Sequence, residues 1–195
     1  MQVLVVFAHP RADSFNRAMA DRAIKGLQDA GHTVHFLDLY ALGFTGAMSF
    51  EERTAYHSDD PILDPLVREH AALAQVCEMF VFIYPTWWSG LPAILKGWLE
   101  RVMVPGVGFR FNSKGKVRPG LSHVRRLVGI STYGSPWRYV KPVNDNGRRT
   151  IMRTIRINTG WWTRRTWLGL YALDTTTPEE RADFLDRVEE KMRSL

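Results

Sequence analysis

The chain has 195 residues, of which 45% are hydrophobic and 24% are charged, and 26 Lys and Arg against 20 Asp and Glu give a net charge of +6. This composition is typical of a globular protein with one domain or at most two small ones, and no apolar run is long enough for a transmembrane helix. Because Cys77 is the only cysteine, a disulfide within the chain and a thiolate metal site are excluded.

The N-terminal stretch MQVLVVFAHP lacks a basic segment, so we expect no signal peptide and a cytoplasmic location. The arginines stand in scattered pairs rather than in one block, namely Arg125-Arg126, Arg148-Arg149 and Arg164-Arg165. Such pairs are typical of a solvated basic surface, with attraction of an anionic ligand as the sharper alternative. We therefore expect no nucleic-acid partner and no insertion into a membrane.

In the first third of the chain the pattern changes from strand to helix and back. β-branched and aromatic residues are continuous over 2–9, which indicates a strand buried on both faces. A helix follows, with Ser14 as its N-cap and Gly31 as its stop. Residues 33–40 alternate and predict a second strand, whereas 41–61 are broken and polar and predict mostly loop.

The middle of the chain repeats this alternation. Residues 65–77 predict a helix and 79–85 a third buried strand. Over 90–103 the apolar residues recur at i, i+3, i+4 and i+7, which predicts a helix whose polar face includes Arg101. The Gly-rich, basic stretch 106–120 predicts a long loop or a hairpin.

The last third supplies two more strands. Residues 125–132 predict the fourth strand, 147–159 a helix and 165–173 the fifth strand. Thr177 and Glu180 form a capping-box pattern that opens a final helix. Strands that alternate with helices, without a linker or a repeat, predict one α/β domain with a parallel sheet covered on both faces.

Three unusual segments follow the first, third and fourth predicted strands: AHPRADSFN, PTWWSG and STYGSP. In an open parallel sheet, ligands bind outside the carboxyl ends of the strands, where the strand order switches. This topology brings all three segments to the same edge, so their coincidence favours a ligand site over three separate structural explanations.

The segment AHPRADSFN leads from a strand into a helix, and the amides and dipole of a helix N-terminus attract anions. His9, Ser14 and Asn16 add donors and Arg11 adds charge, which predicts a phosphate site. The segment contains neither GxGxxG nor GxxxxGK[ST]. The alternative is a well-capped helix with a structural His9.

In PTWWSG, Trp87 and Trp88 offer flat apolar surface beside free backbone groups, which suits a planar aromatic ring system. The alternative is that the pair fills a core or a subunit interface. STYGSP supplies two hydroxyls and a Gly-containing turn that would line the other side of such a ring, or else it is a simple β-turn.

The segments AHPRADSFNRAM, PTWWSGLPAILKGWLERV and STYGSPWRY resemble the signatures of the NAD(P)H:quinone oxidoreductase family, from the first strand to about Tyr139. The resemblance implies a flavodoxin-like fold: a doubly wound, five-stranded parallel sheet of order 2-1-3-4-5 with helices on both faces. It also implies a single flavin-binding domain over residues 1–195 that holds FAD or FMN.

By this resemblance, the loop after the first strand holds the flavin phosphates, the loop after the third follows the isoalloxazine, and the loop after the fourth contacts the polar edge of the ring. The expected cofactor-binding residues are His9, Asp13, Ser14, Phe15, Asn16, Pro85, Thr86, Trp87, Trp88, Ser131, Thr132, Tyr133 and Gly134. Asp13 stands at a position where relatives often have Thr.

The resemblance also assigns a catalytic residue and a substrate pocket. Tyr139 matches a tyrosine that relays charge during hydride transfer, but its usual histidine partner six residues on is Asp145 here. Phe109 and Phe111 match aromatic residues that wall the substrate pocket together with Trp88, often across a dimer interface. We therefore expect a homodimer.

The implied activity is that of an NAD(P)H dehydrogenase (quinone): ping-pong, two-electron hydride transfer from NAD(P)H through the flavin to a quinone or similar small acceptor. The alternatives are an FMN-dependent azo- or nitroreductase, a regulatory flavoprotein subunit that docks on a membrane transport system, and an α/β protein that binds another nucleotide. Arg181 lies near the place where a family arginine approaches the adenosine part of FAD, one residue short in spacing. The sequence leaves open the choice between FMN and FAD and between NADH and NADPH.

Overall fold

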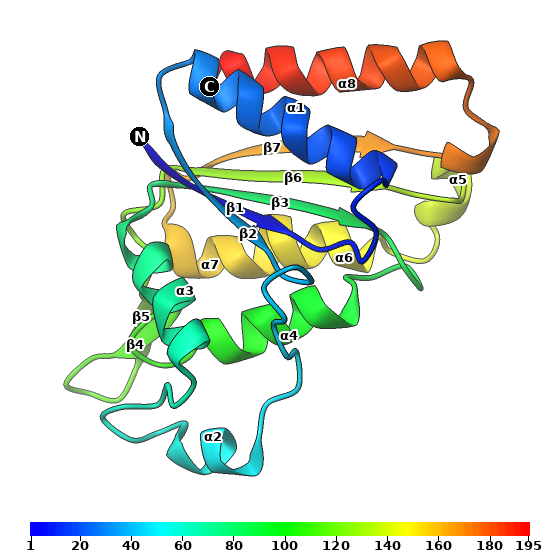
Figure 1. Ribbon diagram of the computed structural model, residues 1–195. Helices are drawn as coiled ribbons and strands as arrows, with labels where there is room; N and C mark the ends of the chain where they lie inside the picture. The colour runs from blue at the N-terminus through cyan, green and yellow to red at the C-terminus, as the bar shows by residue number, and fades with distance from the viewer.

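A five-stranded parallel sheet forms the middle layer of the computed structural model, which describes residues 1–195 (Figure 1). Its order is β2-β1-β3-β6-β7, which confirms the predicted order 2-1-3-4-5 once the strands of this sheet are counted along the chain. The strands are β1 (Gln2–Phe7), β2 (Thr33–Asp38), β3 (Met79–Pro85), β6 (Arg126–Thr132) and β7 (Arg164–Leu170). A separate antiparallel hairpin consists of β4 (Phe109–Phe111) and β5 (Val117–Pro119).

Helices cover both faces of the sheet (Figure 1). On one face lie α1 (Phe15–Asp29) and α8 (Pro178–Arg193), which pack against each other. On the other face lie α3 (Pro65–Val76), α4 (Ala93–Val102) and a helical segment made of α6 (Asn146–Arg149), a π-helical turn (Thr150–Ile155) and α7 (Arg156–Thr159). The short helical pieces are α2 (Phe50–Ala55), α5 (Trp137–Val140) and a 3-10 turn (Leu173–Thr175).

The central strand β3 explains why its sequence is apolar without interruption. All of its residues are buried, and alternate side chains enter opposite cores. Phe80 and Phe82 join the core under α3 and α4, whereas Val81 and Ile83 join the core under α1 and α8. Because β3 is buried along its whole length, the loop that follows it is the first exposed part of this segment.

The predicted helix ends are confirmed. Ser14 accepts a hydrogen bond from the Arg17 amide, and Gly31, with φ of 76°, follows the end of α1. Thr177 and Glu180 form the reciprocal capping box that opens α8. These signals are local in sequence, so the sequence alone was sufficient to predict them.

The first two strands end at Phe7 and Asp38, each two residues earlier than expected, and two further segments differ more from the prediction. The segment 41–61, expected as mostly loop, contains α2, which opens with a capping box between Ser49 and Glu52. The fifth strand, expected over 165–173, ends at residue 170, because Ala172 takes a left-handed backbone with φ of 55° that a strand cannot continue.

Arg101 is buried rather than on a polar face of α4. Its side chain donates to both carboxylate oxygens of Glu52, at 2.6 to 3.1 Å, and to Asp64 at 2.8 Å. The helical period placed α4 correctly, but the ion pairs with α2 and with the N-cap of α3 draw this arginine inward. The buried carboxylate of Glu52 and the partly exposed carboxylate of Asp64 thereby share one cation, which offsets the cost of removing Glu52 from water.

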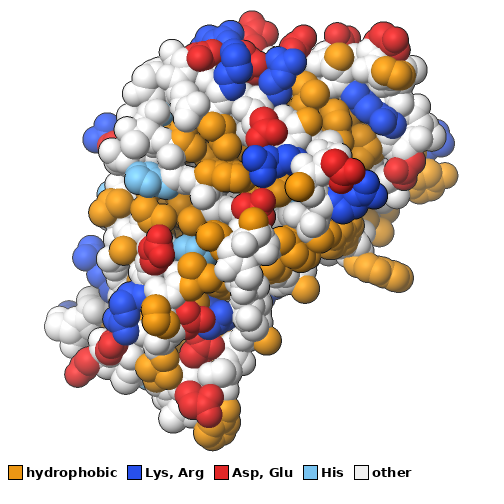
Figure 2. All heavy atoms as spheres, in the orientation of Figure 1, with side chains coloured by type: hydrophobic (Ala, Val, Ile, Leu, Met, Phe, Trp, Pro, Cys, Tyr) orange, Lys and Arg blue, Asp and Glu red, His pale blue; other side chains and the backbone are white.

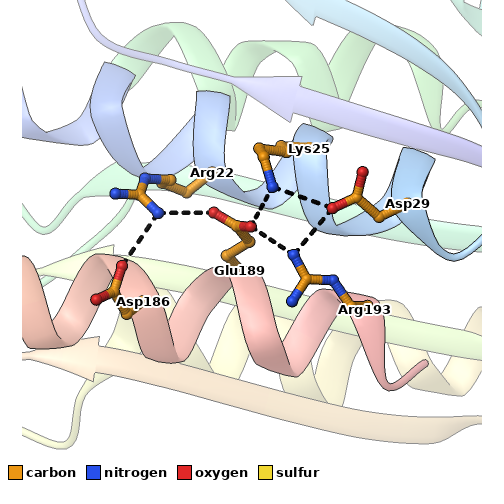
Figure 3. Close-up of polar contacts among 6 residues, drawn as sticks. All are labelled: Arg22, Lys25, Asp29, Asp186, Glu189 and Arg193. Atoms are coloured by element: carbon orange, nitrogen blue, oxygen red, sulfur yellow. Dashed lines mark hydrogen bonds and ion pairs between the residues drawn. The ribbon is translucent and has the colours of Figure 1, made fainter.

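The outer helices α1 and α8 are joined by a network of charges centred on Glu189 (Figure 3). Its carboxylate binds Arg22 at 2.7 Å and also pairs with Lys25 and Arg193. Asp29 pairs with Lys25 and Arg193, and Asp186 pairs with Arg22, so the first and last helices are linked by alternating charge.

Candidate functional site

The loops that follow β1, β3 and β6 lie side by side at the carboxyl edge of the sheet (Figure 1). Backbone hydrogen bonds continue past the strands, from the Ala8 amide to the Ile83 carbonyl at 3.0 Å and from the Thr86 amide to the Thr132 carbonyl at 2.8 Å. The three segments singled out in the sequence are therefore neighbours in space, as the parallel topology requires.

The loop after β1 presents donors for an anion. Ser14 caps α1 and uses the amide of Arg17, while the amides of Phe15 and Asn16 have no hydrogen-bond partner within the chain. Free amides at the start of a long helix, together with the helix dipole, attract negative charge. The loop thus has free backbone donors whose chemistry suits an anion.

His9 adds a side-chain donor to this loop. Its Nδ1 lies 3.1 Å from the Arg11 amide and 3.3 Å from the Arg11 carbonyl oxygen. When Nδ1 accepts the amide hydrogen, the neutral ring carries its proton on Nε2. Partial burial lowers the pKa of the His9 imidazole, which favours the neutral form near pH 7. In that tautomer His9 offers a neutral hydrogen-bond donor at Nε2.

Arg11 does not supply the free charge that the sequence suggested. Its guanidinium binds the Asp13 carboxylate at 2.7 Å, and both side chains are exposed. The hydrogen bond from Arg11 lowers the pKa of the Asp13 carboxyl, so the pair is ionised and close to neutral overall. The donors of this loop that are free to meet an anion are therefore the amides and His9.

Phe15 and Asn16 contribute through their backbone, because their side chains are engaged elsewhere. The Phe15 ring faces Phe184 of α8, with ring centroids 6.4 Å apart. Asn16 is buried, and its Nδ2 donates to Thr132 Oγ1 at 3.0 Å, while its Oδ1 has no partner. Asn16 thus connects the start of α1 to the end of β6.

After β3 the chain makes a tight turn from Trp87 to Gly90, closed by a hydrogen bond of 2.9 Å between the Gly90 amide and the Trp87 carbonyl. Both central residues have left-handed backbones, with φ of 48° at Trp88 and 57° at Ser89. This conformation costs free energy for residues other than glycine and is most often kept at functional sites.

The turn holds the two tryptophans at the surface. Trp87 is 42% exposed, with its ring 6.1 Å from the His9 ring, and Trp88 is fully exposed at 102%. Figure 2 shows hydrophobic side chains at the surface on the side where the loop after β3 lies in Figure 1. Within one chain, the core explanation for Trp88 is wrong.

The loop after β6 is fixed by buried side chains. Ser131 and Thr132 are buried, and Ser131 Oγ lies 2.9 Å from Thr86 Oγ1. Tyr133 is 2% exposed and stacks on Tyr171 at 4.4 Å between ring centroids. These side chains position the loop, so a ligand at this edge would meet its backbone.

Asp145 and Gly147 support the site from α6, and the family signatures that we used did not assign Gly147. The hydroxyl of Tyr133 donates to Asp145 Oδ1 at 3.0 Å, and Asp145 itself has a left-handed backbone with φ of 44°. A Cβ on Gly147 would lie 3.1 Å from the carbonyl carbon of Gly90, a contact so tight that the turn after β3 would have to shift by a few tenths of an ångström. The stretch NDNG was the available signal, since such residues favour left-handed turns.

The remaining predicted residues lie at different places. Tyr139, on α5 at the carboxyl edge, is 60% exposed and its hydroxyl makes no hydrogen bond within the chain. Phe109 and Phe111 lie in the β4–β5 hairpin near the opposite edge of the sheet (Figure 1). Gln75, at the end of α3, reaches this hairpin through the Gly106 carbonyl at 3.4 Å. A single chain does not bring Phe109 or Phe111 to Trp88.

Other kinds of site have no counterpart in the structure. No group of three or more His, Cys, Asp or Glu side chains is placed to hold a metal ion. None of the helices is both long and apolar enough to span a membrane.

Arg181 donates to Thr176 Oγ1 at 2.9 Å and to the Leu173 carbonyl at 3.2 Å, which fixes the loop before α8.

Comparison with known proteins agrees with this architecture. The model of a family described as having a flavodoxin-like fold matches residues 1–195. An uncharacterized NAD(P)H oxidoreductase of Haemophilus influenzae is 35% identical over 137 residues, which cover 69% of this chain and 65% of that protein. NAD(P)H dehydrogenase [quinone] 1 of Rattus norvegicus is 31% identical over 149 residues, which cover 69% and 54%. The chain thus spans 65% and 54% of these two relatives.

A solved structure, the NAD(P)H:quinone oxidoreductase from Methanothermobacter marburgensis, superposes with a TM-score of 0.83 at 26% identity and covers 99% of this chain and 98% of that one. The strand order and the match over the whole sequence show that the chain belongs to the flavodoxin-like fold family. Within that fold it is a member of the NAD(P)H:quinone oxidoreductase family, as the sequence motifs predicted.

Proposed function

We propose that this chain is a flavin-dependent NAD(P)H:quinone oxidoreductase that carries its flavin, FAD or FMN, at the carboxyl edge of the sheet as one domain over residues 1–195. The observation that carries the proposal is the juxtaposition of an anion site with a flat aromatic surface. The free amides of Phe15 and Asn16 lie at the start of α1, and His9 beside them is 6.1 Å from the Trp87 ring. A flavin combines these two chemistries, because it has a phosphate at one end and a planar ring at the other.

The residues present fit this cofactor. The two amides, Ser14 and His9 Nε2 would hold the phosphate, with Asp13 and its partner Arg11 at the rim. The backbone of the turn after β3, from Pro85 to Trp88, would lie along the ring. Bound flavin supplies the acceptor and donor of a hydride, while the chain contributes orientation and electrostatics.

The loop after β6 would meet the polar edge of the ring with backbone from Ser131 to Gly134. This loop is rigid because Asn16 binds Thr132, Thr86 binds Ser131 and Asp145 binds Tyr133. Preorganised donors stabilise developing charge better than mobile ones, since they need not reorient during the reaction. These pairs are positioning contacts rather than participants in the chemistry.

Tyr139 is the proposed catalytic residue. Its hydroxyl is exposed and unengaged at the carboxyl edge, so it is available to stabilise negative charge that develops on a bound ring system. Asp145 occupies the position of the family histidine, but its carboxylate accepts the hydrogen of Tyr133. We infer that Asp145 positions the loop after β6 and that no relay from Tyr139 to residue 145 is needed.

The test is a spectrum of the purified protein, followed by extraction and chromatography of the cofactor. We expect a yellow protein that oxidises NADH or NADPH when a quinone is present. His9→Gln should weaken flavin binding, whereas His35→Gln, partly buried on the edge strand β2, should not. A colourless protein that neither FMN nor FAD reconstitutes would overturn the proposal. Activity confined to azo or nitro compounds would favour the alternative reductases, and weak turnover with capture of a membrane transporter would favour the regulatory role.

We also propose a homodimer. Phe109 is partly buried and Phe111 is 50% exposed, in a hairpin that lies far from the tryptophan turn of the same chain (Figure 1). A second copy would bring this hairpin over the site and wall a pocket with Trp88. Sedimentation should show twice the monomer mass, and Phe111→Ala should raise KM for the quinone without loss of flavin. A strictly monomeric protein with full activity would contradict this proposal.

A further inference from the structure

A second hollow lies outside the proposed flavin site, between the helical segment 146–159 and the edge strand β7. Its volume is about 880 Å³, within the range of pockets that hold small molecules. One carboxylate, that of Asp145, lines it. Seven basic side chains also line this groove: Lys141, Arg148, Arg149, Arg153, Arg156, Arg164 and Arg165.

The fold gathers these charges from separate parts of the sequence. Arg149 and Arg153 are four residues apart and share one face of the helical segment. Strand β7 brings the pair Arg164-Arg165 against that face, with a hydrogen bond of 3.2 Å from Arg165 to the Met152 carbonyl. Two of the scattered arginine pairs of the sequence therefore form one basic concavity.

Most of this charge is uncompensated by the chain. The one ion pair in the groove joins Arg148 to Asp145 at 4.0 Å, while Arg149, Arg153 and Arg164 are exposed and make none. The cations between α1 and α8, by contrast, are neutralised around Glu189. Like charges that crowd a concave surface repel one another and raise the local concentration of anions.

Aromatic rings accompany the cations. Trp137 and Trp167 line the groove, with the Lys141 amine 5.3 Å from the first ring and the Arg148 guanidinium 5.5 Å from the second. Indole faces stack on planar bases, and guanidinium groups bind phosphates through paired donors. Charges on an edge strand also discourage pairing with another sheet, but the arginines of the helix are not needed for that role.

We propose that this groove binds a nucleotide that carries at least two phosphate charges. The groove adjoins the proposed flavin site, because Asp145 lines the groove and also binds Tyr133 of the loop after β6. The phosphates belong either to NADPH, in which case the inference rests on the proposed function, or to a separate nucleoside polyphosphate that binds beside the site.

The test is a titration of the flavin-loaded protein with ATP at low salt, followed by calorimetry and tryptophan fluorescence. We expect saturable one-to-one binding that weakens as salt rises. The variant Arg149→Gln with Arg153→Gln should raise Kd by about ten-fold or more, since charge-assisted contacts to phosphate are lost. The matched control, Arg187→Gln with Lys191→Gln, removes two exposed cations of α8 that make no ion pair and should leave Kd unchanged.

Steady-state kinetics of the same variants distinguish the two sources of the phosphates, NADPH and a separate nucleotide. If the groove variant raises KM for NADPH more than for NADH and ATP competes with NADPH, the ligand is the co-substrate. If ATP binding is lost while both KM values and the flavin content stay the same, the ligand is a separate nucleotide. The absence of saturable ATP binding, equal weakening in both variants, or pyrophosphate that binds as tightly as ATP would overturn the inference. A chain without flavin can still be titrated with ATP, so the two proposals fail separately.

Discussion

At the scale of single residues, Trp88 and Trp98 have opposite environments although ten positions separate them. Trp98 is fully buried in the core under α4, and its Nε1 donates to His70 Nδ1 at 3.2 Å. Trp88 is fully exposed at the tip of the turn after β3. The sequence pattern distinguishes the two, because Trp98 falls within the helical repeat of apolar residues over 90–103 and Trp88 lies before it.

Alanine substitutions should therefore have different effects. Trp98→Ala should lower the free energy of unfolding by about 3–5 kcal/mol, since it leaves a large cavity and an unpaired His70 nitrogen. Trp88→Ala should leave that free energy unchanged and reduce flavin affinity or turnover. Urea unfolding and flavin titration measure the two effects. If both variants lowered only the melting temperature, the residues around Trp88 would have a structural role.

Individual caps could be predicted from the sequence, but pairs distant in sequence could not. Ser14 and the Thr177 capping box depend on neighbours within a few positions. The bond from Asn16 to Thr132 joins residues 116 positions apart and exists because β1 and β6 end at the same edge. Contacts between distant segments also bury the Tyr133 side chain, which was expected to contact the cofactor.

At the scale of elements, α4 is anchored by a charge rather than by apolar packing alone. Arg101 binds Glu52 of α2 and Asp64 before α3, so one guanidinium holds three elements together. The helix itself followed from the period of its apolar residues, but the direction of Arg101 did not, because 41–61 gave no strong helical pattern apart from the four residues of the Ser49 capping box.

We expect Arg101→Ala to lower the free energy of unfolding by about 3–5 kcal/mol, because Glu52 would remain buried without its cation. The matched control is Lys96→Ala on the same helix, whose exposed pair with Glu100 contributes about 0–1 kcal/mol. Chemical denaturation of both variants gives the comparison. Equal stabilities of the two would show that the buried network does not anchor α4.

At the scale of the whole molecule, the order of the strands could be predicted from the sequence. The dependence of stability on pH could not, because it comes from contacts between helices that only the structure shows. Alternation of apolar strands with helices fixed the parallel sheet, and the family motifs fixed its order. The network between α1 and α8 depends on which faces of two amphipathic helices meet, and that is set by tertiary packing. For the same reason, the basic groove could not be predicted from the sequence.

Glu189 makes stability sensitive to acid. Hydrogen bonds from Lys25 and Arg22 lower the pKa of its carboxyl from 4.5 to about 2. Its contribution is fully present above pH 4.5 and falls as the pH drops from there through about 2, because the unfolded chain takes up the proton first. Glu189→Gln should reduce the urea midpoint at pH 7 and flatten its decline between pH 5 and pH 3. Glu190→Gln, beside it but without an ion pair, should reproduce the wild-type curve.

The turn from Trp87 to Gly90 places two consecutive left-handed residues where glycines would adopt the backbone at lower cost. A search for thermostable variants would select this position early, because Ser89→Gly relieves local strain. The same change would loosen the loop that presents the tryptophans. At the proposed site, stability and activity would therefore compete, so laboratory evolution toward heat resistance alone should change this turn first.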